Sequence, residues 1–186
     1  MKIKIVGVDP ALRNFGFAHA LVDIETNEVE IVKLVLTTTE ADKKTAKVVR
    51  KNSDDLNRAQ LLHDALVHEC KDATFAFVEV PVGSQSARAM ASYGICVGVL
   101  TACPVPMIQL TPYEVKIAAT GDKQAAKEEM IEWATGLHPD ANWLMRAGKP
   151  ILANEHLADA VAAVYAGLNT QQFKQAVAML KSAKAA

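Results

Sequence analysis

The sequence has no excess of either charge and no long apolar run, and each absence narrows what the protein can be. Its 186 residues carry 20 Lys and Arg against 21 Asp and Glu. No overall positive field therefore attracts it to nucleic acid, and any face that binds a polyanion must come from local clustering. No stretch of about 18 apolar residues occurs, which excludes a membrane-spanning helix. Because the first residues already have a strand pattern, we expect a soluble, cytoplasmic protein, of either cellular or phage origin.

Cysteines are few and have no metal-binding spacing. Cys70, Cys96 and Cys103 are an odd number, lack a C-x-x-C motif and lie in apolar or helical stretches. They are typical of buried thiols in a reducing compartment. The chain also lacks internal repeats and low-complexity segments, and its 51% hydrophobic content is enough for one good core. We expect a single domain over residues 1–186.

Two groups of strands are predicted. Ile- and Val-rich runs joined by short polar turns predict three consecutive strands, at residues 3–8, 16–22 and 29–36. Two later strands, at residues 75–80 and 105–110, are separated by a predicted helix at about 85–101. Short turns join antiparallel strands, whereas a helix between strands implies a parallel crossover. The sequence therefore predicts an α/β fold with a mixed five-stranded sheet, three antiparallel strands then two parallel ones, flanked by helices.

The first two of the remaining helices have clear boundary signals. Apolar residues at helical spacing predict a helix that ends near Cys70, with Ser53 as its N-cap. Thr111 and Glu114 form a capping box around a proline at the first helical position, and Gly121 ends that helix.

The C-terminal part is predicted to be mostly helical. We expect Asp122 to cap the next helix, residues 136–154 to be loop-like, and Asn154 to cap a helix that runs to about Leu168. A last helix carries Phe173.

Three carboxylates interrupt apolar stretches of these elements. Asp9 ends the first strand, Glu79 lies inside the fourth, and Asp159 lies in the helix after residue 154. A buried carboxylate is costly without a partner. Oxygen ligands from separate segments suit Mg²⁺ or Mn²⁺, and such ions assist phosphodiester hydrolysis. The pattern indicates a metal-dependent nuclease, although a plain turn-forming role would explain Asp9 alone equally well.

Several segments resemble motifs of one known family. The sequence Val-Gly-Val-Asp-Pro with a turn and a glycine occupies residues 6–16, Phe-Val-Glu occupies residues 77–79, and His-Leu-Ala-Asp-Ala occupies residues 156–160. These resemble motifs of the RuvC family of Holliday-junction resolvases, and the similarity extends over nearly the whole chain. The resemblance implies a ribonuclease H-like fold, in which acidic residues from the first strand, the fourth strand and a C-terminal helix meet at one end of the sheet.

The resemblance also implies an activity. It implies a homodimeric endonuclease that resolves four-way (Holliday) DNA junctions by paired symmetric nicks, with the helix at about 85–101 at the dimer interface. A fully buried crossover helix is the alternative. Asp9, Glu79, His156 and Asp159 would be catalytic and would hold one or two Mg²⁺ or Mn²⁺ ions per subunit. Glu155 is the alternative fourth ligand, because it lies four residues before Asp159 and His156 lies three.

DNA contacts follow from the same resemblance. Lys116 and Lys127 reproduce the spacing of two DNA-contacting lysines around a glycine, and Arg13 and Val82 would lie against the junction. The cluster Lys43, Lys44, Lys47, Arg50 and Lys51 either follows phosphates or is a solvated helix face.

The sequence also departs from the family pattern. Ala11 stands where a glycine often follows Asp-Pro, which is tolerated if its φ is negative. Val82 stands where the family often has an aromatic wedge, and valine cannot stack on a base. The connector at residues 37–52 is longer than in compact members.

Two other functions are consistent with parts of this pattern. One is a non-catalytic junction-binding protein, against which the complete set of carboxylates argues. The other is a ribonuclease H or transposase-like nuclease that acts on other branched DNA or on RNA–DNA hybrids. The sequence does not reveal a branch-migration partner or a preferred cleavage sequence.

Overall fold

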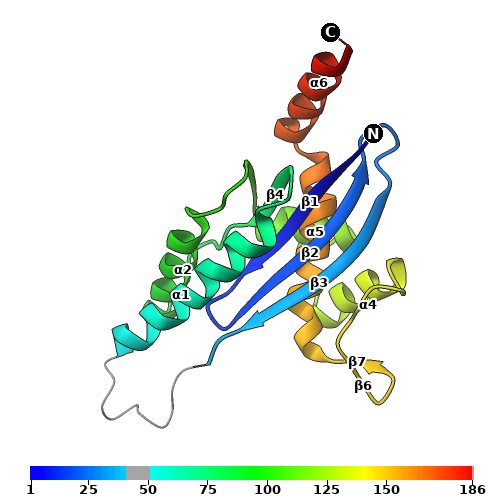
Figure 1. Ribbon diagram of the computed structural model, residues 1–186. Coiled ribbons are helices and arrows are strands. Elements are labelled where there is room, and N and C mark those ends of the chain that lie inside the picture. Colours follow the sequence, from blue (N-terminus) through cyan, green and yellow to red (C-terminus); the bar gives the residue numbers. More distant parts are fainter. Residues whose placement is uncertain (41–50, 186) are drawn as a thin grey trace.

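Five strands of the described residues, 1–40 and 51–185, form one mixed sheet in a computed structural model (Figure 1). The strands are β1 (Lys2–Pro10), β2 (Asn14–Asp23), β3 (Val29–Thr38), β4 (Phe75–Glu79) and β5 (Met107–Leu110). Their order in the sheet is β3-β2-β1-β4-β5. The pairs β1–β2 and β2–β3 are antiparallel, and the pairs β1–β4 and β4–β5 are parallel. The predicted α/β fold with its mixed sheet is confirmed.

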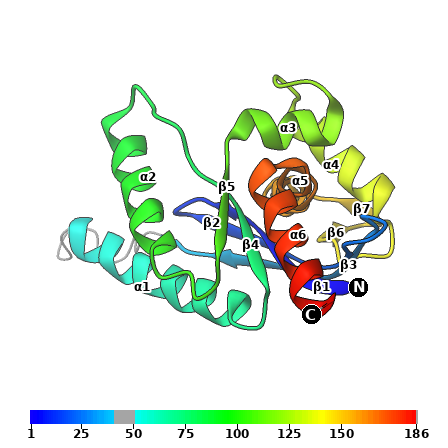
Figure 2. The same ribbon diagram turned by 90° about the horizontal axis from the view of Figure 1, so that it is seen from above.

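Helices cover both faces of this sheet (Figure 2). On one face lie α1 (Lys51–Cys70) and α2 (Ala87–Leu100). On the other lies α5 (Glu155–Asn169), and α3 (Pro112–Thr120) and α4 (Lys127–Leu137) pack against it. The remaining elements are β6 (Met145–Arg146), β7 (Lys149–Pro150), the short 3₁₀ helix η1 (Leu152–Asn154) and α6 (Gln171–Ala185). None of the helices in the described residues combines the length and apolar character needed to cross a membrane.

Alternation along the strands sends side chains into two separate cores. Val6 and Val8 of β1 pack with Leu62 and Leu66 of α1. The intervening residues, such as Ile5, face α5 instead. Cys70 and Cys96 are buried, as the sequence predicts, whereas Cys103 is only half-buried.

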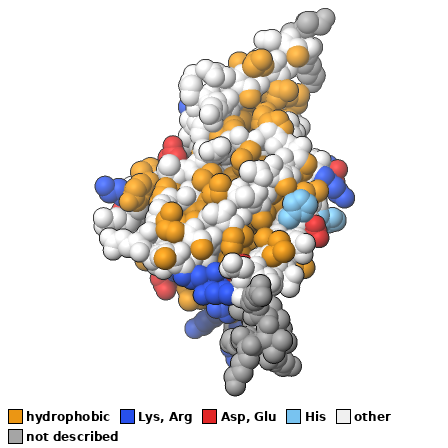
Figure 3. Space-filling model, turned by 90° about the vertical axis from the view of Figure 1, so that its left-hand side faces the viewer, with side chains coloured by type: hydrophobic (Ala, Val, Ile, Leu, Met, Phe, Trp, Pro, Cys, Tyr) orange, Lys and Arg blue, Asp and Glu red, His pale blue; other side chains and the backbone are white. Residues whose placement is uncertain are grey.

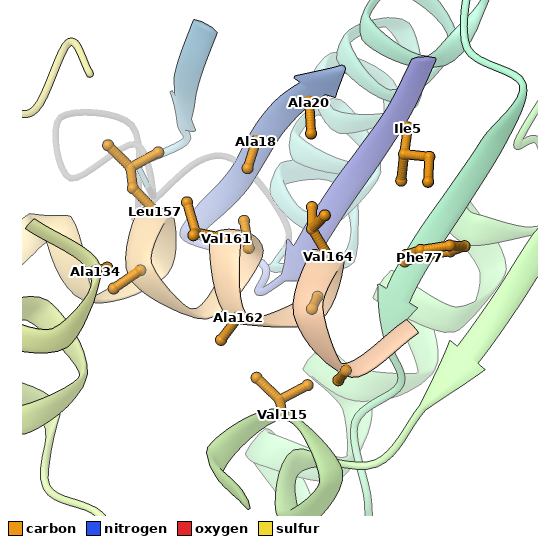
Figure 4. Packing of buried hydrophobic residues seen from close by; sticks show 14 of the residues in the cluster. Ile5, Ala18, Ala20, Phe77, Val115, Ala134, Leu157, Val161, Ala162 and Val164 are labelled. Atoms are coloured by element: carbon orange, nitrogen blue, oxygen red, sulfur yellow. The ribbon is translucent and has the colours of Figure 1, made fainter. Parts of the chain in front are cut away.

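α5 is apolar on nearly all sides because it lies between the sheet and other helices. Its buried residues include Leu157, Val161, Ala162 and Val164, which meet side chains from the sheet, α3 and α4 (Figure 4). A helix that is hydrophobic all round is a buried helix. Most of its buried side chains are alanines, so its backbone can lie close to its neighbours.

Three glycines allow this close approach. A Cβ atom on Gly7 would lie 2.0 Å from the carbonyl oxygen of Ala160, and one on Gly16 would lie 2.2 Å from that of His156. A Cβ atom on Gly167 would lie 2.1 Å from the ring of Phe77. The α5 backbone therefore rests directly on β1 and β2, and this contact sets the position of His156 and its neighbours.

The predicted boundaries of α3 are confirmed. Thr111 and Glu114 form the predicted capping box at the start of α3, and Gly121 ends that helix with φ of 78°.

The other three predicted side chains make no capping hydrogen bond, because each has another role or position. Ser53 lies inside α1, which already includes Lys51. Asp122 accepts from the backbone N–H of Gln124, 2.8 Å away, in a turn that precedes α4. Asn154 stands at the N-cap position of α5, as predicted, but its amide bonds to Leu144 and Ile151 and makes no capping hydrogen bond.

The close contact at Gly7 generates a prediction about stability. Gly7→Ala should lower the free energy of unfolding by about 1–3 kcal/mol, because the new methyl group overlaps the α5 backbone. Gly136→Ala in α4 is the control, since a Cβ there meets open space. It should be neutral or should stabilise by up to about 1 kcal/mol. Urea unfolding measures both, and equal effects would show that α5 does not rest on β1 this closely.

Candidate active site

Asp9 and Glu79 lie at the same end of the sheet on adjacent parallel strands. Gly7 of β1 is in register with Phe77 of β4, so the two carboxylates follow two residues later on both strands. Two residues is one strand period, so both side chains lie on the face covered by α5. Asp9 is 8% exposed.

α5 brings the other two predicted residues to this place. His156 and Asp159 are three residues apart, which puts them on one face of the helix. Nδ1 of His156 lies 2.6 Å from Oδ2 of Asp9. The charges of Asp9 and Asp159 both act on Glu79. The structure thus brings together all four residues that the sequence singled out for metal binding.

The carboxylates of Asp9, Glu79 and Asp159 repel one another. Burial raises the pKa of Glu79 to about 9, and the negative charges of Asp9 and Asp159 contribute, while Lys116 opposes the rise. Burial and the charge of Asp9 raise the pKa of Asp159 to about 7, against His156 and Lys116. A cluster that resists full ionisation at neutral pH is one that a bound cation would stabilise.

His156 is held through both ring nitrogens. The carboxylate of Asp9 accepts from Nδ1, and Nδ2 of Asn14 lies 3.1 Å from Nε2 and donates to it. The hydroxyl of Thr38 donates to Oδ1 of Asn14 over 3.1 Å, which orients the amide. These contacts suit a ring with its proton on Nδ1.

The charge state of His156 is influenced by opposing effects. Burial alone would lower its pKa, but the hydrogen bond to Asp9 and the charges of Asp9, Glu155 and Asp159 outweigh it and raise the pKa. A doubly protonated ring requires the Asn14 amide to turn over and accept from Nε2. The hydroxyl of Thr38 can donate or accept, so it permits both orientations.

Glu155, the alternative fourth ligand, has a different partner. It forms an ion pair with Lys127, and its Oε1 is 3.4 Å from Nε2 of His156. Lys116 donates to the carbonyl oxygen of Ala125 over 2.8 Å. Its charge also opposes the rise in the pKa values of Glu79 and Asp159, so it lies near these carboxylates. Both predicted DNA-contacting lysines therefore lie beside the acidic cluster.

Arg13 and Val82 lie on the loops that leave the sheet beside Asp9 and Glu79. Arg13 is exposed, with its guanidinium 4.0 Å from the carboxylate of Glu40. Val82 is 53% exposed. Of the predicted cationic cluster, Lys43, Lys44, Lys47 and Arg50 lie outside the described residues, and exposed Lys51 begins α1.

The donors fit a hard divalent cation by their chemistry, but they are not arranged as a finished metal site. Among residues 1–40 and 51–185, no three His, Cys, Asp or Glu side chains stand in a geometry that could hold an ion. Three carboxylates, two of them with raised pKa values, and one imidazole nevertheless form a donor set of the kind that Mg²⁺ or Mn²⁺ uses. Side-chain rotation at Asp9, Glu79 and Asp159 would have to accompany binding.

Sequence reasoning missed two residues of this site. Asn14 opens β2 and Thr38 ends β3, and register brings them side by side. A polar residue at the start of an apolar strand, five positions after Asp9, was the available signal for Asn14. Thr38 gave none, because threonine is common in strands.

Comparison with known proteins identifies the fold. No protein-family profile matches the sequence, and no curated protein matches it. T. thermophilus RuvC in complex with a Holliday junction substrate is 22% identical, with a TM-score of 0.61 over 88% of this chain and 92% of that chain. The yeast mitochondrial Holliday junction resolvase Ydc2 is 13% identical, with a TM-score of 0.51 over 95% and 85% of the two chains. The chain has the ribonuclease H-like fold of RuvC.

The raised pKa of Glu79 generates a prediction about pH. Between about pH 4.5 and pH 9 the folded, metal-free protein binds more protons at Glu79 than the unfolded chain, so this group makes stability fall as pH rises. Glu79→Gln should therefore flatten the decline of the melting temperature across this range. At the upper end of this pH range, added Mg²⁺ should raise the melting temperature of the wild type more than that of the variant.

Glu132→Gln, at an exposed position of α4, is the control and should leave the pH dependence unchanged. Thermal unfolding followed by circular dichroism measures all three proteins. An identical decline in the wild type and Glu79→Gln would contradict the proposed repulsion.

Proposed function

We propose that this protein is a metal-dependent endonuclease that resolves four-way DNA junctions by paired symmetric nicks. The observation that carries the proposal is the convergence of Asp9, Glu79 and Asp159 at one end of a ribonuclease H-like sheet. The fold is that of RuvC, a protein whose structure was solved with a Holliday junction substrate. We infer the activity from this likeness and from the chemistry of the site.

The side chains divide the work of phosphodiester hydrolysis. Asp9, Glu79 and Asp159 supply oxygen ligands for one or two Mg²⁺ or Mn²⁺ ions per subunit, with His156 as a fourth ligand or as the group that orients Asp9. When bound, the ions acidify an attacking water and stabilise the leaving 3′ oxygen. Hydrolysis then leaves a 5′ phosphate and a 3′ hydroxyl, which is a ligatable nick.

Lys116 and Lys127 are proposed to bind the DNA backbone beside the scissile phosphate. Lysine binds phosphate as a point charge. Lys127 is 65% exposed although it pairs with Glu155, so its ammonium group keeps room for a phosphate oxygen. Arg13 and Val82 are proposed to contact the junction from the neighbouring loops.

Asp9→Asn is the variant that tests the proposed chemistry. It should abolish cleavage of a synthetic four-way junction with Mg²⁺ or Mn²⁺ and leave junction binding nearly unchanged, because the carboxylate serves the metal. Asp72→Asn, at an exposed turn, is the matched control and should keep full activity. Gel analysis of labelled strands measures cleavage, and anisotropy measures binding.

The same assay separates the alternatives. A linear duplex with the same arm sequence and an RNA–DNA hybrid are tested beside the junction. Preferential cleavage of the hybrid would instead indicate a ribonuclease H-like activity, and binding without cleavage would indicate a junction-binding protein.

A homodimer is proposed through α2. Its exposed side carries Met90 (46% exposed), Val97 (42% exposed), Gly94 and Gly98, and a Cβ atom on either glycine would meet open space. Beside it, a groove of about 970 Å³ runs between α1 and α2. Apolar side chains are spread over this face (Figure 3). A two-fold symmetric substrate needs two sites at a fixed spacing, and a second copy on α2 supplies them.

Gly98→Glu should make the protein monomeric, because the new charge would lie in the proposed interface. The monomer should keep its fold, since the side chain enters open space. Gly136→Glu in α4 is the control, because a Cβ atom there also meets open space, and it should leave the oligomeric state unchanged. Sedimentation at micromolar concentration measures the mass, and a Gly98→Glu variant that remains dimeric would refute this interface.

A further inference from the structure

The hairpin formed by β6 and β7, residues 145–150, holds two cations directly opposite each other. Arg146 pairs with Lys149 across the two strands, and both side chains are exposed. Neither has an ion-pair partner among the described residues. Like charges opposite each other on a two-stranded ribbon destabilise it. Folding alone therefore gives no reason for this pair.

The turn of the hairpin is also locally unfavourable. Ala147 has φ of 50° and Gly148 has φ of 76°, which is the conformation of a tight two-residue turn with both central residues left-handed. Glycine adopts this conformation freely, but alanine does not. Strain of this kind is found where a loop has to present particular side chains.

Buried hydrogen bonds fix the base of the hairpin. Asn154, fully buried, accepts from the N–H of Leu144 and donates to the carbonyl oxygens of Leu144 and Ile151, at 2.8–3.0 Å. On the other side, the amide of Asn142 exchanges two hydrogen bonds with the backbone of Leu34 on the edge strand β3. The hairpin is thus attached both to the start of α5 and to the sheet.

This attachment puts the base of the hairpin beside the start of α5, which carries part of the candidate active site. Asn154 is followed directly by Glu155 and by His156, which contacts Asp9. Figure 1 shows β6 and β7 at the end of the molecule where α5 begins. The whole chain carries a net charge of −1. Two neighbouring cations without ion-pair partners in the described part of the chain, Arg146 and Lys149, therefore give this end of the molecule a local positive charge.

We infer that the β6–β7 hairpin is a second DNA contact, in which Arg146 and Lys149 bind the phosphodiester backbone of the arm that leaves the active site on this side. The inference rests on the proposed function for the identity of the substrate. A phosphate between the two cations would relieve their repulsion, and the planar guanidinium of Arg146 can donate two hydrogen bonds to it. The fixed base means that little loop ordering accompanies binding.

Salt dependence of binding tests this inference. Anisotropy measures the affinity of the full-length protein for a labelled four-way junction and for a linear duplex, without divalent cations, at several salt concentrations. The double variant Arg146→Ala/Lys149→Ala should bind at least about tenfold more weakly at low salt. It should also lower the slope of log K against log salt by about two units.

Two further proteins make the result specific. Lys71→Ala/Lys174→Ala removes two exposed lysines that also have no ion-pair partner in the described chain, and it should leave the slope unchanged. Lys149→Glu creates an opposite-charge pair with Arg146, so it should raise the melting temperature while weakening DNA binding. A residue with a purely structural role would change stability and binding in the same direction.

The outcomes distinguish this inference from the proposed function. Slopes that are equal in the wild type and the Arg146/Lys149 double variant overturn the hairpin contact, even if the junction is cleaved. Binding of the duplex but not of the junction overturns the proposed function, and the two slopes on the duplex still decide the role of the hairpin. A wild type that binds neither DNA overturns both.

Discussion

The backbone of α5 lies against β1 and β2 without a side chain between them, and the candidate site depends on this contact. Gly7 and Gly16 have no Cβ atom, so the carbonyl groups of Ala160 and His156 come within a distance that any larger residue would prevent. The same approach puts His156 within 2.6 Å of Asp9 and brings Asp159 into the field of Glu79. The same close contact therefore determines both the packing of α5 and the geometry of the candidate site. The small alanine side chains of α5 allow this contact.

The acidic cluster works against the stability that this packing supplies. Burial and mutual repulsion raise the pKa values of Glu79 and Asp159, and Lys116 and His156 compensate only in part. Such a cluster persists because the surrounding core holds its members in place. A bound cation would remove this repulsion, which makes the cluster a candidate cation site.

The two faces of the sheet have different surroundings. The α5 face carries the acidic residues, and the β6–β7 hairpin is attached to the start of α5. The other face is covered by α1 and α2, which are joined by a two-pronged ion pair between Asp55 and Arg88. Their outer surfaces keep exposed apolar side chains such as Leu56 and Met90. The candidate active site and the proposed self-association surface thus lie on opposite faces of one sheet.

The sequence by itself determined the five strands, their antiparallel and parallel groups and the Thr111–Glu114 cap, because periodicity and turn chemistry act over a few residues. It also identified Asp9, Glu79 and Asp159, since a carboxylate in an apolar stretch is visible without a structure. Tertiary structure alone decided how the polar side chains are paired. It joined Glu155 to Lys127 and His156 to Asp9 and Asn14, and it turned Asn154 from a helix cap into the anchor of a hairpin. The physical reason is that a polar group bonds to the partner that folding brings closest, and these partners come from segments up to 147 residues apart.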